Sequence, residues 1–369
     1  MSRWRNLAFR AAERFVDYFF RRPSWPARLL GAGVTLIIGG LGIGSLAGDL
    51  TWLSAGSIFR LALDTGGGGL PIHWSQATVI IGLVFATVGG IFGVADHVAD
   101  RRQLRMQRVL VLEHRGLHQA VDTPLAAAVP KPLKGQIDGM PIDHRQSTST
   151  SQITSPEDAL SQIAALRQQL RQKRDAAGPG NVKVVYGGMA PVPLTFLAGM
   201  MIDNEADLTL MDWDRFESRW RELDGADDGD RFVVSGHDEL PKDATEVALA
   251  IAVSYPTDVE AIRATLSDIP LVRMALPTLS TSAHWSSEKQ SAMAKDFTNL
   301  LGDLMGKGIK RIHLFIAAPN SVVFSLGRHF DDRLHPDAAI YQYERSAMPP
   351  FPWAVDLPTH GRPPKIIRI

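Results

Sequence analysis

Two long uncharged runs near the start of the chain constrain its fold more than any other feature. Leu29–Gly48 has 20 residues, LLGAGVTLIIGGLGIGSLAG, and Ser75–Ala95 has 21, SQATVIIGLVFATVGGIFGVA. At a helical rise of about 1.5 Å per residue, each run is long enough to cross a hydrocarbon core of about 30 Å. Core helices of soluble proteins rarely run so far without a charged face. The sequence therefore predicts a two-helix transmembrane hairpin over residues 29–95.

The arginines around these runs predict the orientation of the hairpin. Within about 20 residues of the runs, five precede the first and five follow the second, and the loop between the runs has only Arg60. Because basic residues near membrane spans stay on the cytoplasmic side, we expect a multi-pass protein with both termini in the cytoplasm and residues 49–73 outside. Residues 1–28 are expected to form a basic amphipathic segment on the inner leaflet, with a plain helical extension as the alternative. The flanking arginines are Arg10, Arg14, Arg21, Arg22 and Arg28, then Arg101, Arg102, Arg105, Arg108 and Arg115.

Small residues recur at every fourth position in both runs, which places them on one helix face. Such residues let helix backbones approach closely in a membrane, where lipid provides no hydrophobic drive for association. Two interpretations stay open: packing within one hairpin, and packing between protomers. The predicted helix-packing residues are Gly40, Gly44 and Gly48 in the first run and Gly82, Ala86 and Gly90 in the second.

After a charged juxtamembrane linker at residues 96–107, short apolar strands alternate with helices over residues 108–369. This alternation is typical of parallel sheets with crossover helices, so we predict a cytoplasmic α/β domain. Residues 144–154 are polar and are expected to form a loop. The expected strands are Val109–Leu112, Val182–Tyr186, Val247–Val253 and Arg311–Ala317, the last strong strand of the pattern. The expected helices run from Ser155 to about Arg174 and from Ser286 to Met305, the second ended by Gly306.

Four positions in the α/β part repeat at a displacement of 128 residues, and each set follows a strand and opens a helix. Pro191, Leu194, Phe196 and Gly199 match Pro319, Val322, Phe324 and Gly327. The repeat predicts two fused Rossmann-like halves, with the ligand held at the turns beyond the strand ends.

The residues of these turns suit phosphate. Gly187 and Gly188 remove side-chain bulk after the first strand, and Asn320 with Ser321 offers donors after Pro319, where the second helix begins. The alternative for each turn is purely structural: glycines needed for a tight turn, and Asn and Ser as helix caps.

Composition and motifs exclude several functions. Lys+Arg and Asp+Glu both total 39, so the chain is no generic polyanion binder, and we expect no DNA or RNA partner. No P-loop, zinc-protease helix or nucleophile elbow occurs, and cysteine is absent. We therefore predict a non-enzymatic protein without metal or other cofactor, and we read the acidic run at residues 222–230 as a solvated turn.

Three stretches of the sequence resemble the SAVED domain, a sensor of cyclic oligonucleotides in bacterial anti-phage signalling. They are VVYGGMAPVPLTFLAG at Val184–Gly199, IHLFIAAPNSVVFSLGR at Ile312–Arg328 and YERSAMPPFPWAVDL at Tyr343–Leu357. The resemblance implies that residues 108–369 form a sensor of two CARF-like halves and that the membrane hairpin is the effector. It also implies a cyclic oligonucleotide ligand, first of all a cyclic trinucleotide, made by a companion nucleotidyltransferase, and assembly of the sensor once the ligand is bound.

Candidate contacts for such a ligand follow from its chemistry. Its phosphates need a cation, for which Arg115 after the first strand is the leading candidate, and its bases need flat groups such as Tyr255 and Trp285. The alternatives are a juxtamembrane surface arginine for Arg115 and a strand-end or core position for Tyr255.

Two functions are therefore open. One is a ligand-gated effector of the bacterial inner membrane, whose assembled hairpins disrupt the bilayer in abortive infection. The other is a membrane-tethered receptor that acts through a partner or slowly cleaves its messenger.

Overall fold

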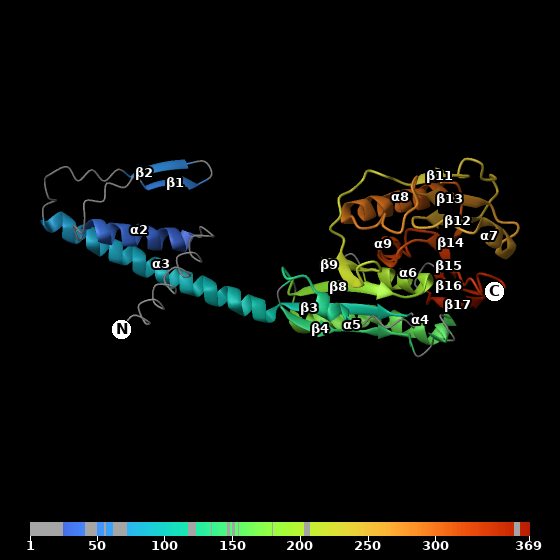
Figure 1. The fold of residues 1–369 in the computed structure, drawn as a ribbon, viewed down its shortest axis with the longest axis horizontal. Helices are drawn as coiled ribbons and strands as arrows, with labels where there is room; N and C mark the ends of the chain where they lie inside the picture. The colour runs from blue at the N-terminus through green and yellow to red at the C-terminus, as the bar shows by residue number, and fades with distance from the viewer. Residues whose placement is uncertain are drawn as a thin grey trace. The chain divides into compact units, whose positions relative to one another are not determined.

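The computed structural model describes most of the chain, in two compact units, Met1–Gln103 and Leu104–Ile369, which are considered separately here (Figure 1). The described residues are 25–40, 50–54, 57–61, 72–116, 123–133, 135–145, 148–149, 152–153, 155–178, 180–202, 207–357 and 362–369.

Within its described residues the first unit has the helices α2 (Trp25–Gly40) and α3 (Ile72–Met106). It also has an antiparallel pair, β1 (Leu50–Ser54) and β2 (Ser57–Leu61), which the sequence analysis did not predict. Within the described residues, one stretch, Gln76–Val98 of α3, is long and apolar enough to cross a membrane. The rest of the first uncharged run, residues 41–48, lies outside the described residues. Helix α3 continues through the expected linker to Met106, because nothing between residues 96 and 106 breaks a helix.

Helices α2 and α3 touch backbone to backbone through glycines. A Cβ atom at Gly33 would lie 2.4 Å from the Ala86 nitrogen, and one at Gly82 would lie 2.8 Å from the Gly33 oxygen. A Cβ atom at Gly89 would lie 2.6 Å from the Leu30 nitrogen. Small residues on both helices are thus what allows this close packing within one chain.

The predicted helix-packing residues divide into three groups. Gly82 and Ala86 lie in the contact between α2 and α3, whereas a Cβ atom at Gly90 would meet only a Leu30 methyl carbon, at 3.7 Å. Gly40 is the last residue of α2. Gly44 and Gly48 lie outside the described residues. Gly33 and Gly89, which the four-residue spacing passed over, belong to the contact as well.

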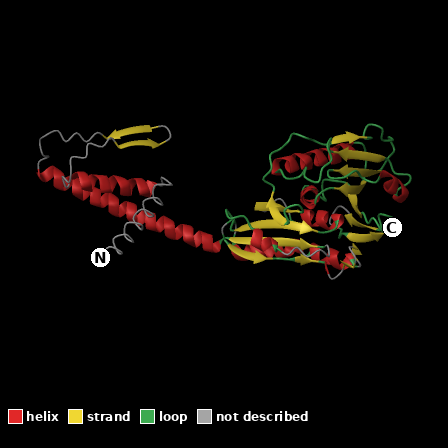
Figure 2. Cartoon of the chain, viewed as in Figure 1, coloured by secondary structure: helices red, strands yellow, loops and turns green. Residues whose placement is uncertain are grey.

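The described part of the second unit has two large sheets (Figure 2) and a small antiparallel pair, β6 with β7. In the first sheet, β4, β3, β8 and β9 run parallel in that order, β10 is antiparallel at one edge, and β5 extends the pairing along β3. These strands are β3 (Arg108–Arg115), β4 (Gln136–Gly139), β5 (Ile142–Asp143), β8 (Val182–Met189), β9 (Asp207–Asp214) and β10 (Arg219–Glu222). The other elements of this part are η1 (Leu125–Ala128), β6 (Thr148–Ser149), β7 (Gln152–Ile153), α4 (Pro156–Ala164), α5 (Leu166–Ala177) and α6 (Val192–Met201).

The second sheet has the order β11-β13-β12-β14-β15-β16-β17, with β13, β12, β14 and β15 parallel. Its strands are β11 (Val233–Ser235), β12 (Glu246–Ala252), β13 (Leu271–Ala275), β14 (Arg311–Ala317), β15 (Asp337–Gln342), β16 (Trp353–Leu357) and β17 (Lys365–Arg368). Its helices are α7 (Val259–Thr265), α8 (Ser287–Gly306) and α9 (Asn320–Arg328).

Two sequence predictions need correction. Arg311–Ala317 is not the last strong strand, because β15 and β16 follow and are buried in the same sheet. The helix expected from Ser155 onward is interrupted at Ala165, where α4 ends before α5 begins. The helix expected over Ser286–Met305 is confirmed: α8 ends at Gly306, and the chain turns at Gly308, whose φ of +95° favours glycine.

The two sheets repeat one another in order, direction and register. The order β4-β3-β8-β9-β10 corresponds to β13-β12-β14-β15-β16. Lys183 pairs with Asp207 between β8 and β9, and Arg311 pairs with Asp337 between β14 and β15. Helices α6 and α9, which open after the matched prolines, lie between the sheets (Figure 1) and are buried in a shared core.

Helices α6 and α9 cross at the matched glycines. A Cβ atom at Gly199 would lie 2.2 Å from the Phe324 oxygen, and one at Gly327 would lie 2.0 Å from the Phe196 oxygen. The contact is reciprocal: the glycine of each helix receives the backbone of the matched phenylalanine of the other. The repeat in the sequence therefore marks the axis along which the two sheets are joined.

Candidate functional site

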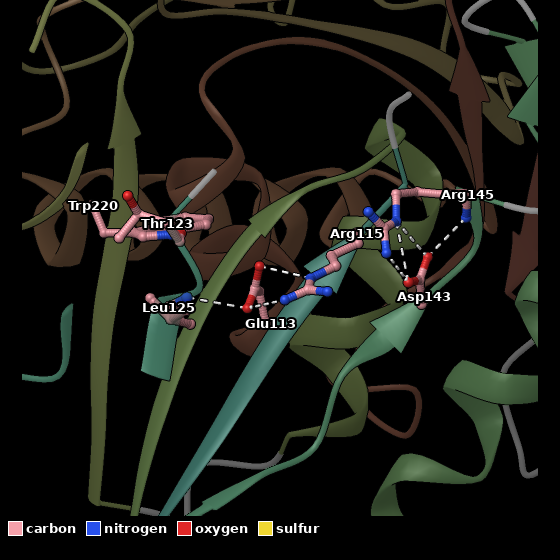
Figure 3. A network of polar contacts seen from close by, with 7 residues as sticks. All are labelled: Glu113, Arg115, Thr123, Leu125, Asp143, Arg145 and Trp220. Carbon is pink, nitrogen blue, oxygen red and sulfur yellow. Dashed lines mark hydrogen bonds and ion pairs between the residues drawn. The ribbon is translucent and has the colours of Figure 1, made fainter. Parts of the chain in front are cut away.

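Two arginine–carboxylate pairs lie at the carboxyl end of β3 and β5 (Figure 3). Arg115 donates from Nε and Nη2 to the two oxygens of Glu113, both at 2.7 Å. Arg145 donates from Nε to the two oxygens of Asp143, at 2.9 and 3.1 Å. Arg115 and Asp143 are partners in the pairing of β3 with β5, which brings the two pairs together. Carboxyl ends of parallel strands are the usual place for a ligand in α/β folds.

The four groups differ in exposure. The side chain of Glu113 is 7% exposed and also accepts a hydrogen bond from the Leu125 backbone nitrogen. Arg115, Asp143 and Arg145 are each about one third exposed, at 31%, 34% and 35%. Three of the four charged groups can therefore be reached from solvent.

Hydrogen bonding within the pairs governs their titration. The bond to Glu113 raises the pKa of Arg115, and the bonds from Arg145 lower the pKa of Asp143. The nearby Arg115 charge lowers the pKa of Asp143 further, so the two pairs also interact with each other. Each pair joins one basic and one acidic side chain, so the formal charges of the four sum to zero.

Two buried histidines lie beside these pairs on the same strand ends. The Nδ1 atom of His114 is 2.9 Å from the Tyr186 hydroxyl, and its ring meets the His144 ring edge to face at 5.2 Å between centroids. Burial lowers the pKa of His114 well below its ordinary value and that of His144 to about 4, and raises the pKa of Tyr186. Both histidines are therefore neutral at pH 7.

Gly187 and Gly188, predicted to leave room for phosphate, lie against side chains of the chain itself. A Cβ atom at Gly187 would lie 2.9 Å from the Trp220 ring, and one at Gly188 would lie 2.9 Å from the Tyr186 hydroxyl and 3.0 Å from the His114 Cβ atom. The space beside each glycine is filled by the chain itself.

The start of α9, predicted to bind phosphate, is likewise occupied from within. The Ser321 backbone nitrogen donates to Asp212 at 3.0 Å, and its hydroxyl accepts from Gln290 at 2.9 Å. Asn320 accepts from the Thr195 hydroxyl at 2.8 Å, and Pro319 has no N–H and caps the helix without a side-chain bond. These hydrogen bonds hold α9 against the first sheet and α6, and they occupy the Ser321 backbone nitrogen and the Asn320 side-chain oxygen.

The start of α6 is capped in the same manner from the other half. The Val192 backbone nitrogen donates to Gln342 of β15 at 3.1 Å. Gln342 lies two residues after Ile340, the strand partner of Leu314, and Asp212 lies two residues after Leu210, the strand partner of Tyr186. Leu314 and Tyr186 are themselves 128 residues apart, so the two caps hold equivalent positions. Each sheet thus provides a side-chain oxygen to the helix of the other sheet.

The two aromatic candidates are placed differently. Tyr255 follows β12 and is 60% exposed, so its ring is accessible. Trp285 is half-buried, with its ring 4.2 Å from the His284 ring and 4.8 Å from the Arg221 guanidinium carbon. Among the described residues, no hydrogen bond, ion pair or ring contact joins Arg115 to Tyr255 or Trp285. The structure therefore brings Arg115 together with Arg145, which the sequence analysis missed. Within the described part of the chain, Tyr255 and Trp285 contact neither arginine in any of these ways.

A sequence signal for the missed residues exists. Residues 113–115 read Glu-His-Arg and residues 143–145 read Asp-His-Arg. In each triplet the acid binds the arginine two residues on, and the histidines between them meet on the opposite face, as strand alternation requires.

Other features of the described residues do not add to this site. A groove of about 320 Å³ is lined by Met140, Pro141, Leu166, Gln169, Gln172 and Lys173, none of which was predicted as a contact. Among the described residues, no group of three or more histidine, aspartate or glutamate side chains could hold a metal ion.

The comparisons with known proteins fit this architecture. The family model of the SAVED domain, the SMODS-associated and fused to various effectors sensor domain, matches residues 160–357, which is more than half of the chain. The model of the SAVED-fused 2TM effector domain matches residues 4–160. The chain belongs to the SAVED family, as a sensor domain joined to a two-transmembrane-helix effector domain. Strands β3 and β4 fall within the effector match, although they pair in the sheet of β8.

Solved structures were also compared. The Acinetobacter baumannii Cap4 SAVED/CARF-domain containing receptor with the cyclic trinucleotide 2'3'3'-cAAA is 12% identical, with a TM-score of 0.45 over 78% of this chain and 60% of that one. The Moraxella osloensis Cap4 receptor is 10% identical, with a TM-score of 0.42 over 75% and 58%. The chain thus spans about three fifths of the length of these receptors. No curated protein matches.

Proposed function

We propose that this protein is a membrane effector whose cytoplasmic sensor binds a cyclic oligonucleotide messenger. The observation that carries the proposal is the succession, in one chain, of a SAVED-fused 2TM effector match and a SAVED sensor match. A cyclic trinucleotide is the first ligand to try, because two Cap4 structures among the compared receptors contain one. The source of the messenger would be a companion nucleotidyltransferase, and the response abortive infection.

The sensor is proposed to consist of two fused Rossmann-like halves that begin at residue 108. The matched strand order and register support this division, as does the reciprocal crossing of α6 and α9. On this account the 2TM effector match extends into the sensor, because β3 belongs to its first sheet.

Arg115 and Arg145 are the proposed phosphate contacts. A guanidinium fork binds phosphate oxygens bidentately, and both side chains are partly exposed at the carboxyl end of parallel strands. Tyr255 is proposed to stack a base, since its ring is accessible. Trp285 is a weaker proposal, because His284 and Arg221 already contact its ring.

The hairpin is proposed to cross the bacterial inner membrane with both termini in the cytoplasm and to act without catalysis. Two hydroxyls of its helices bond within their own helix, Thr35 to the Gly31 oxygen and Thr87 to the Leu83 oxygen. They therefore provide no polar stripe for a pore within one chain. Disruption of the bilayer would need several hairpins, brought together when messenger-bound sensors assemble.

Messenger binding tests this function. Full-length protein in detergent should bind at least one member of a panel of cyclic di-, tri- and tetranucleotides, measured by calorimetry. Replacing Arg115→Gln removes a charge-assisted contact and should weaken binding about tenfold or more. Unchanged affinity would remove Arg115 from the site, and a lack of binding across the panel would contradict the sensor function.

A further inference from the structure

The acid-His-Arg triplets at residues 113–115 and 143–145 place two guanidinium groups at one strand end, and both guanidinium groups are already occupied. Each holds a carboxylate of its own triplet through two hydrogen bonds. Figure 3 shows the two pairs side by side, with Glu113 also bonded to Leu125.

A carboxylate and a phosphate compete for the same guanidinium fork. Both anions accept two parallel N–H bonds from one edge of the guanidinium, and in each triplet the carboxylate already holds the Nε and Nη2 edge. A messenger that used Arg115 and Arg145 would have to displace Glu113 and Asp143 from that edge or bind the remaining Nη1 edge beside them, where the carboxylates would repel its phosphates at short range.

We propose that Glu113 and Asp143 are internal competitors of the messenger, which lower the affinity of the two-arginine site for its phosphates. This inference rests on the proposed function of Arg115 and Arg145. The competitors neutralise the site while no messenger is present, and they set the messenger concentration at which the sensor fills.

The two competitors differ in how firmly they hold. Glu113 is nearly buried and is fixed by the Leu125 nitrogen, whereas Asp143 is one third exposed. Arg145 is therefore released first, and Arg115 exchanges its partner only at higher messenger concentration. When Arg115 leaves, Glu113 keeps its bond to Leu125, so η1 need not move.

Isosteric amides test the competition. Glu113→Gln and Asp143→Asn keep an oxygen that accepts from the Leu125 or Arg145 nitrogen but remove the negative charge. Each should tighten the binding of cyclic triadenylate to the full-length protein, on the order of fivefold to tenfold, and the double variant more. The affinity of the variants should also fall more steeply with salt, because the uncompensated arginines meet the phosphates alone.

A matched control exists on another strand turn. Glu217 binds Arg219, again two residues on, in an exposed pair between β9 and β10. Glu217→Gln removes the same kind of pair and should leave messenger affinity and its salt dependence unchanged.

The outcomes separate the two proposals. Suppose that the wild-type protein binds the messenger and that both amide variants, with unchanged unfolding temperatures, bind it equally or more weakly. The proposed competition by Glu113 and Asp143 is then wrong, and the sensor function stands. If Glu113→Gln unfolds, the exposed Asp143→Asn variant decides in its place. If neither the wild type nor the double variant binds any cyclic oligonucleotide, the sensor function and the competition fail together.

Discussion

At the scale of the residue, the glycines after the first parallel strands act through the side chains that fill their space. Gly188 leaves room for the hydroxyl of Tyr186 beside His114, and Tyr186 in turn stacks on Phe324 at 3.8 Å between ring centroids. A glycine with no φ constraint thus fixes a contact between β8 and α9. Residue type alone suggested a phosphate turn because glycine is common in both settings.

Gly188→Ala should destabilise the sensor by about 1–3 kcal/mol. The new Cβ atom would lie 2.9 Å from the Tyr186 hydroxyl and 3.0 Å from the His114 Cβ atom, so a buried contact must shift. Gly139→Ala in β4 is the control, because its Cβ atom would meet nothing within 4 Å. Thermal unfolding of the full-length protein in detergent measures both, and equal unfolding temperatures would contradict the packing role.

The buried histidines predict a loss of stability in mild acid. Burial keeps His114 and His144 neutral in the folded protein, and the pKa of His144 is lowered to about 4, while the unfolded chain takes up protons below about pH 6.5. Stability contributed by the neutral rings is therefore complete above pH 6.5 and is lost toward pH 4, by about 1.4 kcal/mol per pH unit for each histidine.

Unfolding at pH 7.5 and at pH 4.5 tests this. His144→Leu should reduce the difference in unfolding free energy between the two pH values, since one of the two titrating rings is gone. Ile142→Val, a conservative change in the same buried strand end, removes no titrating ring; it is the control and should leave the difference unchanged. A wild-type protein equally stable at both pH values would show that the histidines are not held neutral.

At the scale of the element, the matched helices α6 and α9 were the most predictable part of the sensor. Proline before each helix and the apolar spacing after it are local signals, and the glycine at each crossing stands at the same offset. The local sequence did not predict strands β15 and β16, because a short apolar run after a loop can be a strand or a buried helix segment. It also could not predict the caps by Asp212 and Gln342, which depend on how the two sheets meet.

Gly199→Ala and Gly327→Ala should each weaken the joint between the halves by more than about 2 kcal/mol. The added atoms would lie 2.2 and 2.0 Å from backbone oxygens, which cannot turn aside as a flexible side chain can. Gly302→Ala in α8 is the control. Its Cβ atom would meet nothing within 4 Å, and alanine favours a helix by up to about 1 kcal/mol. Soluble yield and unfolding temperature report the effect. If neither falls in Gly199→Ala and Gly327→Ala, the close backbone contact between α6 and α9 is contradicted.

At the scale of the whole molecule, the sequence predicted the two-part plan better than the site. The length of the two uncharged runs and the arginines around them predict a membrane hairpin without any tertiary information. The three SAVED-like stretches indicated the sensor domain that the family model matches. The two arginine pairs escaped prediction because Arg145 lies in a stretch read as a polar loop, and only the pairing of β5 with β3 brings it to Arg115. The two acid-His-Arg triplets mark the pairs in the sequence, but the strand register that joins them across 28 residues has no local signal.

Dye release from vesicles tests the central claim, that messenger binding by the sensor leads to disruption of the bilayer by the hairpins. Purified full-length protein would be reconstituted into vesicles that hold a self-quenching dye, and the cyclic oligonucleotide that binds in calorimetry would be added. The account predicts release that rises with messenger over the range in which the sensor fills, and a curve shifted to about tenfold or more higher messenger with Arg115→Gln. Saturated binding without release above that of unliganded vesicles would contradict it and would make the hairpin a tether.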